Sequence, residues 1–174
     1  MTKFEGLVSA DSLPALRQVW RHFGTSVSVV STDTDDGPRT MLATAVTSLT
    51  LDPPSLLVCV NKSASAHAGL LKRGAFSVSL LAHAERELAG HIASAGTTAR
   101  FDVGDWRRLE GHSALLDGLP YLDEAQATFF CRIDGKLDYG THTVLIGRVE
   151  YLMHDIQEYA LQYCDGKFGR FVAG

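Results

Sequence analysis

The sequence predicts a mainly β domain with some helix: an antiparallel barrel with helices packed on its outside and across its mouth. Segments with strand patterning outnumber helical segments about six to three, and they lack the regular strand–helix alternation of a doubly wound parallel sheet. The chain has 174 residues, the size of one domain with a continuous core. We therefore expect residues 1–174 to form a single domain, with residues 1–11 as a flexible N-terminus.

The first elements expected are a helix and a strand. Ser12 can cap the helix and Gly24 can end it. The helix has an apolar stripe at i, i+3, i+4 and i+7 that we expect to be buried: Leu16, Val19, Trp20 and Phe23. The following segment, Thr25–Thr32, alternates in character and predicts a strand.

Two further strands are expected after a turn at residues 33–38. Thr40–Leu51 is rich in Thr, Val and Ala and predicts one strand, which Asp52-Pro53-Pro54 ends. Ser55–Val60 is a continuous apolar run and predicts a strand buried on both faces.

A polar stretch, Asn61–Ser65, precedes a short helix expected over Ser65–Lys72 and closed by Gly74. Ala75–Leu81 then predicts a strand, and a helix is expected over residues 84–95, with acidic residues in its first turn.

The second half of the chain is less regular. Residues 96–123 form an irregular section in which Trp106 is expected to plug the barrel. Gln126–Ile133 and Thr141–Met153 predict two long strands, joined by a turn at residues 134–140. The tail from residue 159 is mixed in character.

Charge and cysteine content exclude several classes of protein. Acidic residues exceed basic ones by 20 to 16 without clustering, so we expect no binding to nucleic acid or to an anionic membrane. No apolar segment approaches the roughly 20 residues of a membrane-spanning helix, and the N-terminus lacks a signal-peptide pattern. Cys59, Cys131 and Cys164 are widely spaced, which indicates reduced thiols and a cytoplasmic protein.

Common catalytic motifs are missing from the sequence. It has no GxGxxG dinucleotide motif, no GxxxxGK[ST] phosphate loop and no GxSxG nucleophile elbow. Its seven histidines show neither HxH nor HExxH spacing, so we expect no metal site. The first absence argues against a Rossmann dinucleotide domain, and the others against a P-loop and a nucleophile elbow.

Two segments could bind a ligand, and each has a simpler interpretation. The small side chains of residues 41–48 would let a flat ring approach the backbone, or the segment is a half-exposed strand with Thr outward and Ala inward. The hydroxyl, amide and ammonium groups of residues 61–66 suit a phosphate, or Ser63 or Ser65 merely caps the helix that follows.

Motifs in these segments and beyond them resemble a known family. The motifs occur in the order TMLATAVTSLTLDPPSLLVCVNKSAS, GAFSVSLL, Arg100-Phe101 and GTHTVLIGRV, and the resemblance extends over residues 16–168. Together they resemble the flavin reductase-like family, the small reductase components of two-component flavin monooxygenases. The resemblance implies an FMN-binding split barrel of antiparallel, Greek-key-like strands with flanking helices.

The resemblance also implies roles for individual residues. Leu42–Ala45 would line the isoalloxazine through backbone groups, Asn61, Ser63 and Ser65 would hold the phosphate, and Arg100 would add a cation. His142 would be the catalytic residue, near the site where the nicotinamide stacks. Tyr163, Gly166 and Phe168 match a C-terminal pattern close to the pocket. The full set of cofactor-binding residues expected is Leu42, Ala43, Thr44, Ala45, Ser48, Asn61, Lys62, Ser63, Ala64, Ser65, Arg100, Phe101, Tyr163 and Phe168.

The activity that the resemblance implies is hydride transfer from NADH or NADPH to FMN or FAD. It further implies a homodimer that supplies reduced flavin to a partner monooxygenase. The sequence departs from the family pattern at Thr44, Ala99 and Thr141, which leaves the preferred flavin and nicotinamide open. The alternatives are a non-catalytic flavin- or haem-binding split barrel and a flavoprotein oxidase that keeps its flavin.

Overall fold

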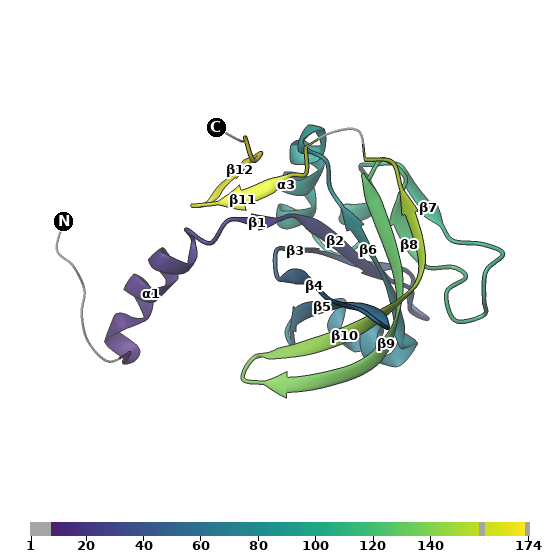
Figure 1. Cartoon of the computed structure of the whole chain (residues 1–174), viewed down its shortest axis with the longest axis horizontal. Coiled ribbons are helices and arrows are strands. Elements are labelled where there is room, and N and C mark those ends of the chain that lie inside the picture. The colour runs from purple at the N-terminus through teal and green to yellow at the C-terminus, as the bar shows by residue number, and fades with distance from the viewer. Residues whose placement is uncertain (1–7, 157–158, 173–174) are drawn as a thin grey trace.

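A seven-stranded antiparallel sheet forms the body of the molecule in the computed structural model, which describes residues 8–156 and 159–172 (Figure 1). Its strand order is β3 (Arg39–Ala43), β2 (Ser28–Thr32), β6 (Ala75–Leu80), β9 (Ala127–Tyr139), β10 (His142–His154), β5 (Pro54–Asn61) and β4 (Val46–Leu51). The two edge strands, β3 and β4, are consecutive in the chain. The sheet therefore curls into a barrel that stays split between them, as the sequence predicts.

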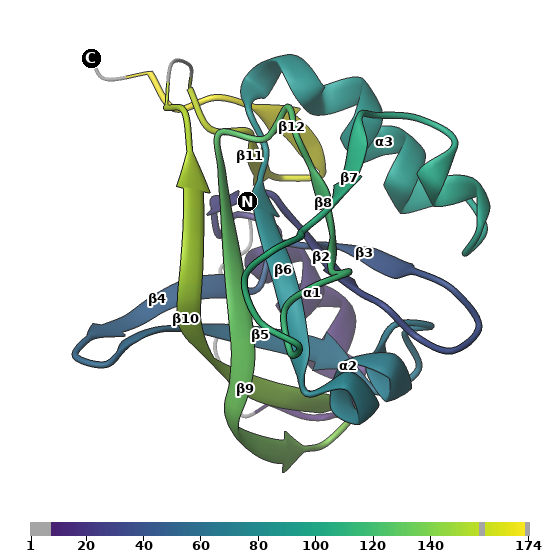
Figure 2. The ribbon, with the colours of Figure 1, turned by 90° about the vertical axis from the view of Figure 1, so that its right-hand side faces the viewer.

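Smaller elements cover the ends of this barrel (Figures 1 and 2). The helix α2 (His67–Arg73) lies at one end, and α3 (Arg86–Ser94) lies at the other, beside a three-stranded sheet. That sheet consists of β1 (Thr25–Ser26), β11 (Gln162–Cys164) and β12 (Lys167–Gly169). A separate pair is formed by β7 (Trp106–Arg108) and β8 (Pro120–Leu122). Short 3-10 helices span Ala10–Ser12, His83–Glu85 and Ala99–Phe101.

The core lies inside the barrel and under the two covering helices. The central cluster includes the fully buried Val30, Val58, Phe76 and Leu145, and Leu70 of α2 packs against it. A second cluster lies beneath α3 and includes Val27, Val29, Leu81, Leu88, Ile92 and Leu161. We call this second group the α3 cluster.

The predicted first helix forms, but its apolar stripe is not buried in this chain. The helix α1 (Leu13–Trp20) projects away from the barrel, and none of its residues is buried. Val19, Trp20 and Phe23 are 60%, 58% and 66% exposed. The prediction was wrong on this point because periodicity identifies the face that another surface can cover, but not which surface covers it. Of the predicted flexible N-terminus, residues 1–7 lie outside the described residues.

The predicted strand Thr40–Leu51 is two strands. The chain leaves the β2 edge after Ala43, passes Thr44 and Ala45, and joins the β5 edge at Val46. The sequence gives no sign of the interruption, because the residue types on both sides of it and within it are compatible with a strand. The interruption follows from the crossing between the two edges of the sheet, which is a tertiary feature.

The predicted turn at residues 134–140 is also wrong. Strand β9 continues to Tyr139, and only Gly140 and Thr141 connect it to β10. Ile146 pairs with Gly135, whereas Gly147 pairs with Ile133, so Asp134 is an extra residue in a β-bulge. An Asp-Gly pair is typical of both turns and bulges, and here it forms the bulge.

The predicted strand Thr25–Thr32 is also two strands, because β1 pairs with β11 in the small sheet and β2 joins the large sheet. The two helices that follow agree with the prediction apart from their ends. Gly74 closes α2 in the left-handed conformation, with φ of 71°. The helix expected over residues 84–95 starts as a 3-10 turn and continues as α3. Trp106 is half-buried, with its ring centroid 4.5 Å from that of Phe101, and it packs against the α3 cluster.

Candidate functional site

The loop Asn61–Ser65 joins β5 to α2 and is organised by one side chain. The amide oxygen Oδ1 of Asn61 accepts hydrogen bonds from the N–H and from the hydroxyl of Ser63, both at 2.9 Å. The backbone oxygen of Asn61 accepts from the N–H of Ala64 at 2.9 Å. We call residues 61–65 the Asn61 loop. Its serines are exposed, and Ala64 packs against the central cluster.

The two serines do not cap the helix that follows. The N-cap of α2 is Ala66, which makes no side-chain cap bond, and the helix begins at His67 rather than at Ser65. The hydroxyls of Ser63 and Ser65 therefore remain at the surface, where an anion could reach them. This finding removes the capping interpretation and favours a ligand-binding role.

The β9–β10 hairpin brings His142 to the Asn61 loop. His142 is the first residue of β10 and pairs with Asn61 of β5 and with Tyr139 of β9. The N–H of Lys62 donates to the carbonyl of Thr141 at 2.9 Å, and its Nζ donates to the carbonyl of Gly140 at 3.2 Å. The His142 ring is exposed, and its Nδ1 lies 2.9 Å from the hydroxyl of Thr141. Two segments that are about 80 residues apart in sequence thus form one surface.

The split of the barrel adds a backbone edge to this surface. Ala43 is buried, Thr44 is half-buried and Ala45 is exposed. The carbonyl of Ala45 accepts from the N–H of Cys59 at 3.0 Å. Within the described residues β3 pairs only with β2, so its outer edge has no strand partner. Small side chains beside such an edge allow a planar ring to approach peptide groups.

Arg100 is fixed against the same strand. Its Nη1 donates to the carbonyl of Thr40 at 2.7 Å, and its Nε donates to the carbonyl of Ala95 at 3.2 Å. Arg100 itself lies in the short 3-10 helix that follows α3, and these bonds hold its half-buried guanidinium beside β3. The cation therefore lies near Met41 and Leu42, on the part of β3 that precedes the split.

Aromatic side chains from the C-terminal strands complete this region. The rings of Tyr163 and Phe168 lie 5.5 Å apart, edge to face. Both pack against the α3 cluster, as does Leu42 of β3. In Figure 1 the β11–β12 pair and the β9–β10 hairpin project on the same side of the barrel as α1, one above it and one below. We use the term band for the elements on this side of the barrel that carry predicted site residues: the β9–β10 hairpin, the Asn61 loop that it contacts and the β11–β12 pair.

Ser48 lies apart from the other predicted residues. It pairs with Leu56, five residues before Asn61 on β5, which corresponds to about 17 Å along the strand. There it lines a mainly apolar groove of about 460 Å³ at the open side of the barrel, together with Val46, Val149 and Leu152. The structure thus brings together the Asn61 loop and His142, but it does not bring Ser48 to them.

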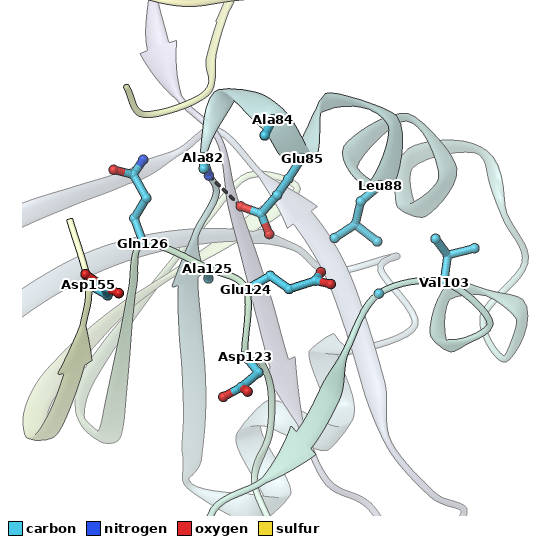
Figure 3. Close-up of a pocket in the computed structure, with 11 residues that line it drawn as sticks. Ala82, Ala84, Glu85, Leu88, Val103, Asp123, Glu124, Ala125, Gln126 and Asp155 are labelled. Atoms are coloured by element: carbon cyan, nitrogen blue, oxygen red, sulfur yellow. Dashed lines mark hydrogen bonds between the residues drawn. The ribbon is translucent and has the colours of Figure 1, made fainter. Parts of the chain in front are cut away.

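A different cavity, of about 620 Å³, lies between α3 and the chain that leads into β9 (Figure 3). Four carboxylates line it, those of Glu85, Asp123, Glu124 and Asp155, and its described lining includes no lysine or arginine. One oxygen of Glu85 accepts a hydrogen bond from the N–H of Ala82. Negative potential makes this cavity a poor site for a phosphate. It contains none of the predicted cofactor-binding residues.

The sequence interpretation missed several residues of the band. Leu137 and Tyr139 are 64% and 80% exposed, and Tyr139 lies across from His142. Thr143 and Asp138 form a hydrogen bond beneath them. An available signal was the alternation of Lys136 and Asp138 with Leu137 and Tyr139, which indicates that a strand continues there.

Electrostatics at the hairpin favour an ionised carboxylate. The hydrogen bond from Thr143 lowers the pKa of Asp138, and the charge of Lys62, whose Nζ lies 3.6 Å away, acts in the same direction. By contrast, burial raises the pKa of the Cys131 thiol, so this cysteine is unsuited to act as a nucleophile. The groups described at the band are suited to hydrogen bonding and ring stacking.

Comparison with known proteins shows which family this chain resembles in sequence and structure. The sequence model of the flavin reductase like domain matches residues 20–171. The FMN reductase (NADH) RutF of Stutzerimonas stutzeri is 35% identical over 168 residues, which cover 94% of this chain and 91% of that protein. The solved NADH:FAD oxidoreductase SgcE6 of Streptomyces globisporus, in complex with NAD and FAD fragments, has a TM-score of 0.85 and 32% identity, covering 97% and 98% of the two chains. BorF, the flavin reductase component of a bacterial two-component tryptophan halogenase, has a TM-score of 0.80 and 33% identity, covering 93% and 99%.

Proposed function

The chain belongs to the flavin reductase-like family, and from this premise we propose that it is a flavin reductase that oxidises reduced nicotinamide and reduces FMN or FAD. The observation that carries this proposal is the junction of the Asn61 loop with the β9–β10 hairpin. The exposed hydroxyls of the loop would bind the flavin phosphate, and the exposed histidine beside them would contact the nicotinamide. NADH is the proposed donor, because the RutF relatives and SgcE6 are named as NADH enzymes.

The residues of this chain fit a flavin phosphate and ring. Ser65 offers a hydroxyl donor, and Asn61 holds the loop by accepting hydrogen bonds from the N–H and the hydroxyl of Ser63. The Ser63 hydroxyl would have to rotate away from Asn61 to donate to a phosphate. The unpaired edge of β3 offers peptide groups to the polar edge of a ring, and Arg100 adds a positive charge beside it. Thr44, at the split, contributes a hydroxyl.

The protein contributes positioning rather than covalent chemistry. The flavin, when bound, supplies the hydride-accepting centre. His142 would orient the nicotinamide by hydrogen bonding to its carboxamide or to a pyrophosphate oxygen. The bond between Nδ1 of His142 and Thr141 leaves Nε2 available for that contact. Such orientation is worth several kcal/mol of activation free energy in favourable cases.

We also propose that two copies associate through the side of the molecule that carries the site. Support comes from the apolar residues that this side leaves exposed on two separate elements. Val19 and Trp20 lie on α1, Phe23 follows three residues after its end, and Leu137 and Tyr139 lie on the hairpin; all five are exposed. Exposed apolar surface is typical of protein interfaces, and we propose that these side chains belong to one. A second copy would then cover the band of predicted site residues.

The proposed consumer of reduced flavin is a flavin-dependent monooxygenase or halogenase, reached by diffusion. BorF is such a component, which supports the assignment. No helix in the described parts of the chain is long and apolar enough to cross a membrane. We propose a cytoplasmic location, which the free thiols of Cys59, Cys131 and Cys164 support.

The activity can be tested directly with the purified protein under anaerobic conditions. FMN or FAD is added with NADH or NADPH, and loss of the oxidised flavin absorbance is followed. We expect bleaching that needs both protein and nicotinamide, with NADH preferred. Flavin binding without bleaching would instead support a non-catalytic flavin module. Flavin that stays bound through gel filtration and is reoxidised on the protein would support an oxidase.

A further inference from the structure

Thr143 lies where three elements of the proposed site meet. It is the second residue of β10, follows His142 directly and is fully buried. Its hydroxyl lies 2.9 Å from Nε2 of His67, the first residue of α2, and 2.5 Å from Oδ1 of Asp138 on β9. One oxygen atom therefore joins the helix after the Asn61 loop to both strands of the hairpin.

The directions of these hydrogen bonds follow from the proton count. A threonine hydroxyl has one proton, and an ionised carboxylate can only accept. The hydroxyl of Thr143 therefore donates to Asp138, and its oxygen accepts from Nε2–H of His67. The result is a chain of donors that runs from His67 through Thr143 to Asp138.

A second link between the same elements lies at the surface. The ammonium of Lys62 bonds to the carbonyl of Gly140 and faces Asp138 at 3.6 Å. Asp138 and Lys62 are about half exposed, so water and salt weaken their attraction. The Thr143 side chain is fully buried and its two hydrogen bonds are partly buried, whereas the bond from Lys62 to Gly140 is exposed. The Thr143 link is therefore less open to water than the Lys62 link and better able to fix the hairpin.

We infer that Thr143 is a positioning residue for the proposed hydride transfer: it holds His142 in a fixed relation to the Asn61 loop by bonding to His67 and Asp138. This inference rests on the proposed function, because it assigns the two sides of the junction to the nicotinamide and the flavin phosphate. Thr143 touches neither ligand. It acts through the placement of His142.

The first test compares Thr143→Val, which keeps the shape and removes the hydroxyl, with Thr143→Ser, which keeps the hydroxyl. We expect Thr143→Val to lower kcat/KM for NADH about tenfold, with the Kd for FMN changed less than about threefold. Thr143→Ser should restore most of the loss. Equal effects of the two variants would overturn the inference.

A second test asks whether Thr143 acts through His142. Thr143→Val is combined with His142→Ala, and the two losses in kcat/KM are compared. We expect no further loss from Thr143→Val when His142 is already absent. Losses that multiply would show that the hydroxyl acts independently of His142 and would overturn the inference.

The partner residue Asp138 provides a variant that is less able to disturb folding, because its side chain is more than half exposed. Asp138→Ala removes the acceptor of the Thr143 hydroxyl, whereas Asp138→Asn keeps an oxygen there. Hydrogen–deuterium exchange of residues 136–143 should increase in the alanine variant and much less in the asparagine variant. This readout needs no ligand, so it remains decisive if Thr143→Val does not fold.

The outcomes separate the inference from the proposed function. If the wild-type protein does not reduce flavin with any nicotinamide, the proposed function fails, and exchange still reports whether Thr143 fixes the hairpin. If the wild-type protein is active and the alanine and asparagine variants of Asp138 exchange alike, the inference fails and the function stands.

Discussion

Strands β2 and β4 have almost the same kinds of residues and opposite environments. β2 reads Ser-Val-Val-Ser-Thr and is buried at every position, whereas β4 reads Val-Thr-Ser-Leu-Thr-Leu and is exposed at every position but the first. The difference comes from their places in the sheet, because β2 lies between β3 and β6, and β4 is an edge strand paired only with β5.

Most of the buried hydroxyls of β2 and β6, which we call the closed side, have protein partners. Ser31 bonds to Thr40, Thr32 donates to the carbonyl of Ala75, and Ser79 bonds to Thr128. The polar groups on the split side instead face outward. The comparison indicates that β2 and β6 stabilise the fold and that the split side is available for binding.

Replacing a core aromatic residue should show the largest effect on stability. Phe76 of β6 is fully buried in the central cluster, so Phe76→Ala should lower the free energy of unfolding by about 3–5 kcal/mol. Leu51→Ala on β4, where the side chain is 92% exposed, should change it by less than about 0.5 kcal/mol. Urea unfolding of both variants measures the difference, and similar losses would contradict the assignment of stability to the closed side.

Removing the hydroxyls of the Asn61 loop should affect binding rather than stability. Ser63→Ala combined with Ser65→Ala is expected to weaken FMN binding by about 1.5–3 kcal/mol for each well-placed bond to the phosphate. Riboflavin, which has no phosphate, serves as the control ligand in fluorescence titrations and should be affected far less. Equal losses for FMN and riboflavin would show that the loop does not bind the phosphate.

A charge on the exposed face of α1 should disrupt the proposed dimer. Trp20→Glu is expected to weaken association by about 2 kcal/mol or more, since buried tryptophans are frequent hot spots. Sedimentation at micromolar concentration should then show the 18.9 kDa chain, whereas the wild-type protein should sediment as a dimer. Gln18→Glu places the same charge on a neighbouring exposed position and should remain dimeric. A wild-type monomer would rule out the dimer.

His142→Ala should change catalysis by a smaller amount. Loss of an orienting contact is expected to lower kcat/KM for NADH roughly ten- to hundredfold, with flavin affinity nearly unchanged. Stopped-flow reduction at several NADH concentrations distinguishes a higher KM from slower reduction. Wild-type kinetics in the variant would remove His142 from the site.

Acid should produce the smallest change. The pKa of Asp138 is lowered in the folded protein, so its contribution to stability is present at neutral pH and is lost as the carboxylate is protonated, below about pH 4. Asp138→Asn removes this contribution at every pH. The difference in Tm between wild type and variant should therefore be constant above about pH 5 and shrink at lower pH. If the difference in Tm grew as the pH fell, the pKa of Asp138 would be raised rather than lowered in the folded protein.

Sequence patterns predicted those parts of the fold that depend on local chemistry. The cap at Gly74 and the buried strand at 55–60 follow from residue types alone. The gap at Thr44 does not, because it arises from the crossing between sheet edges. The exposed stripe of α1 shows the same limit, since an amphipathic pattern does not say which chain covers it.

The candidate site was predictable to a similar extent. The family motifs identified the Asn61 loop and His142, and the structure brings these two segments together. They could not identify Thr143, His67 and Asp138 as a group, because that contact joins three elements, and their alignment depends on the turn between β9 and β10 and on the packing of α2. The position of Ser48 also depends on the register of β4 against β5.

The two residues that span the split also limit how far it can open. From Ala43 to Val46 the chain takes three steps of about 3.8 Å, so the ends of β3 and β4 can never lie more than about 11 Å apart. Their other ends, at Arg39 and Leu51, have no such tether. Any widening of the split must therefore move Arg39 and Leu51 apart, while the distance spanned by Thr44 and Ala45 stays limited.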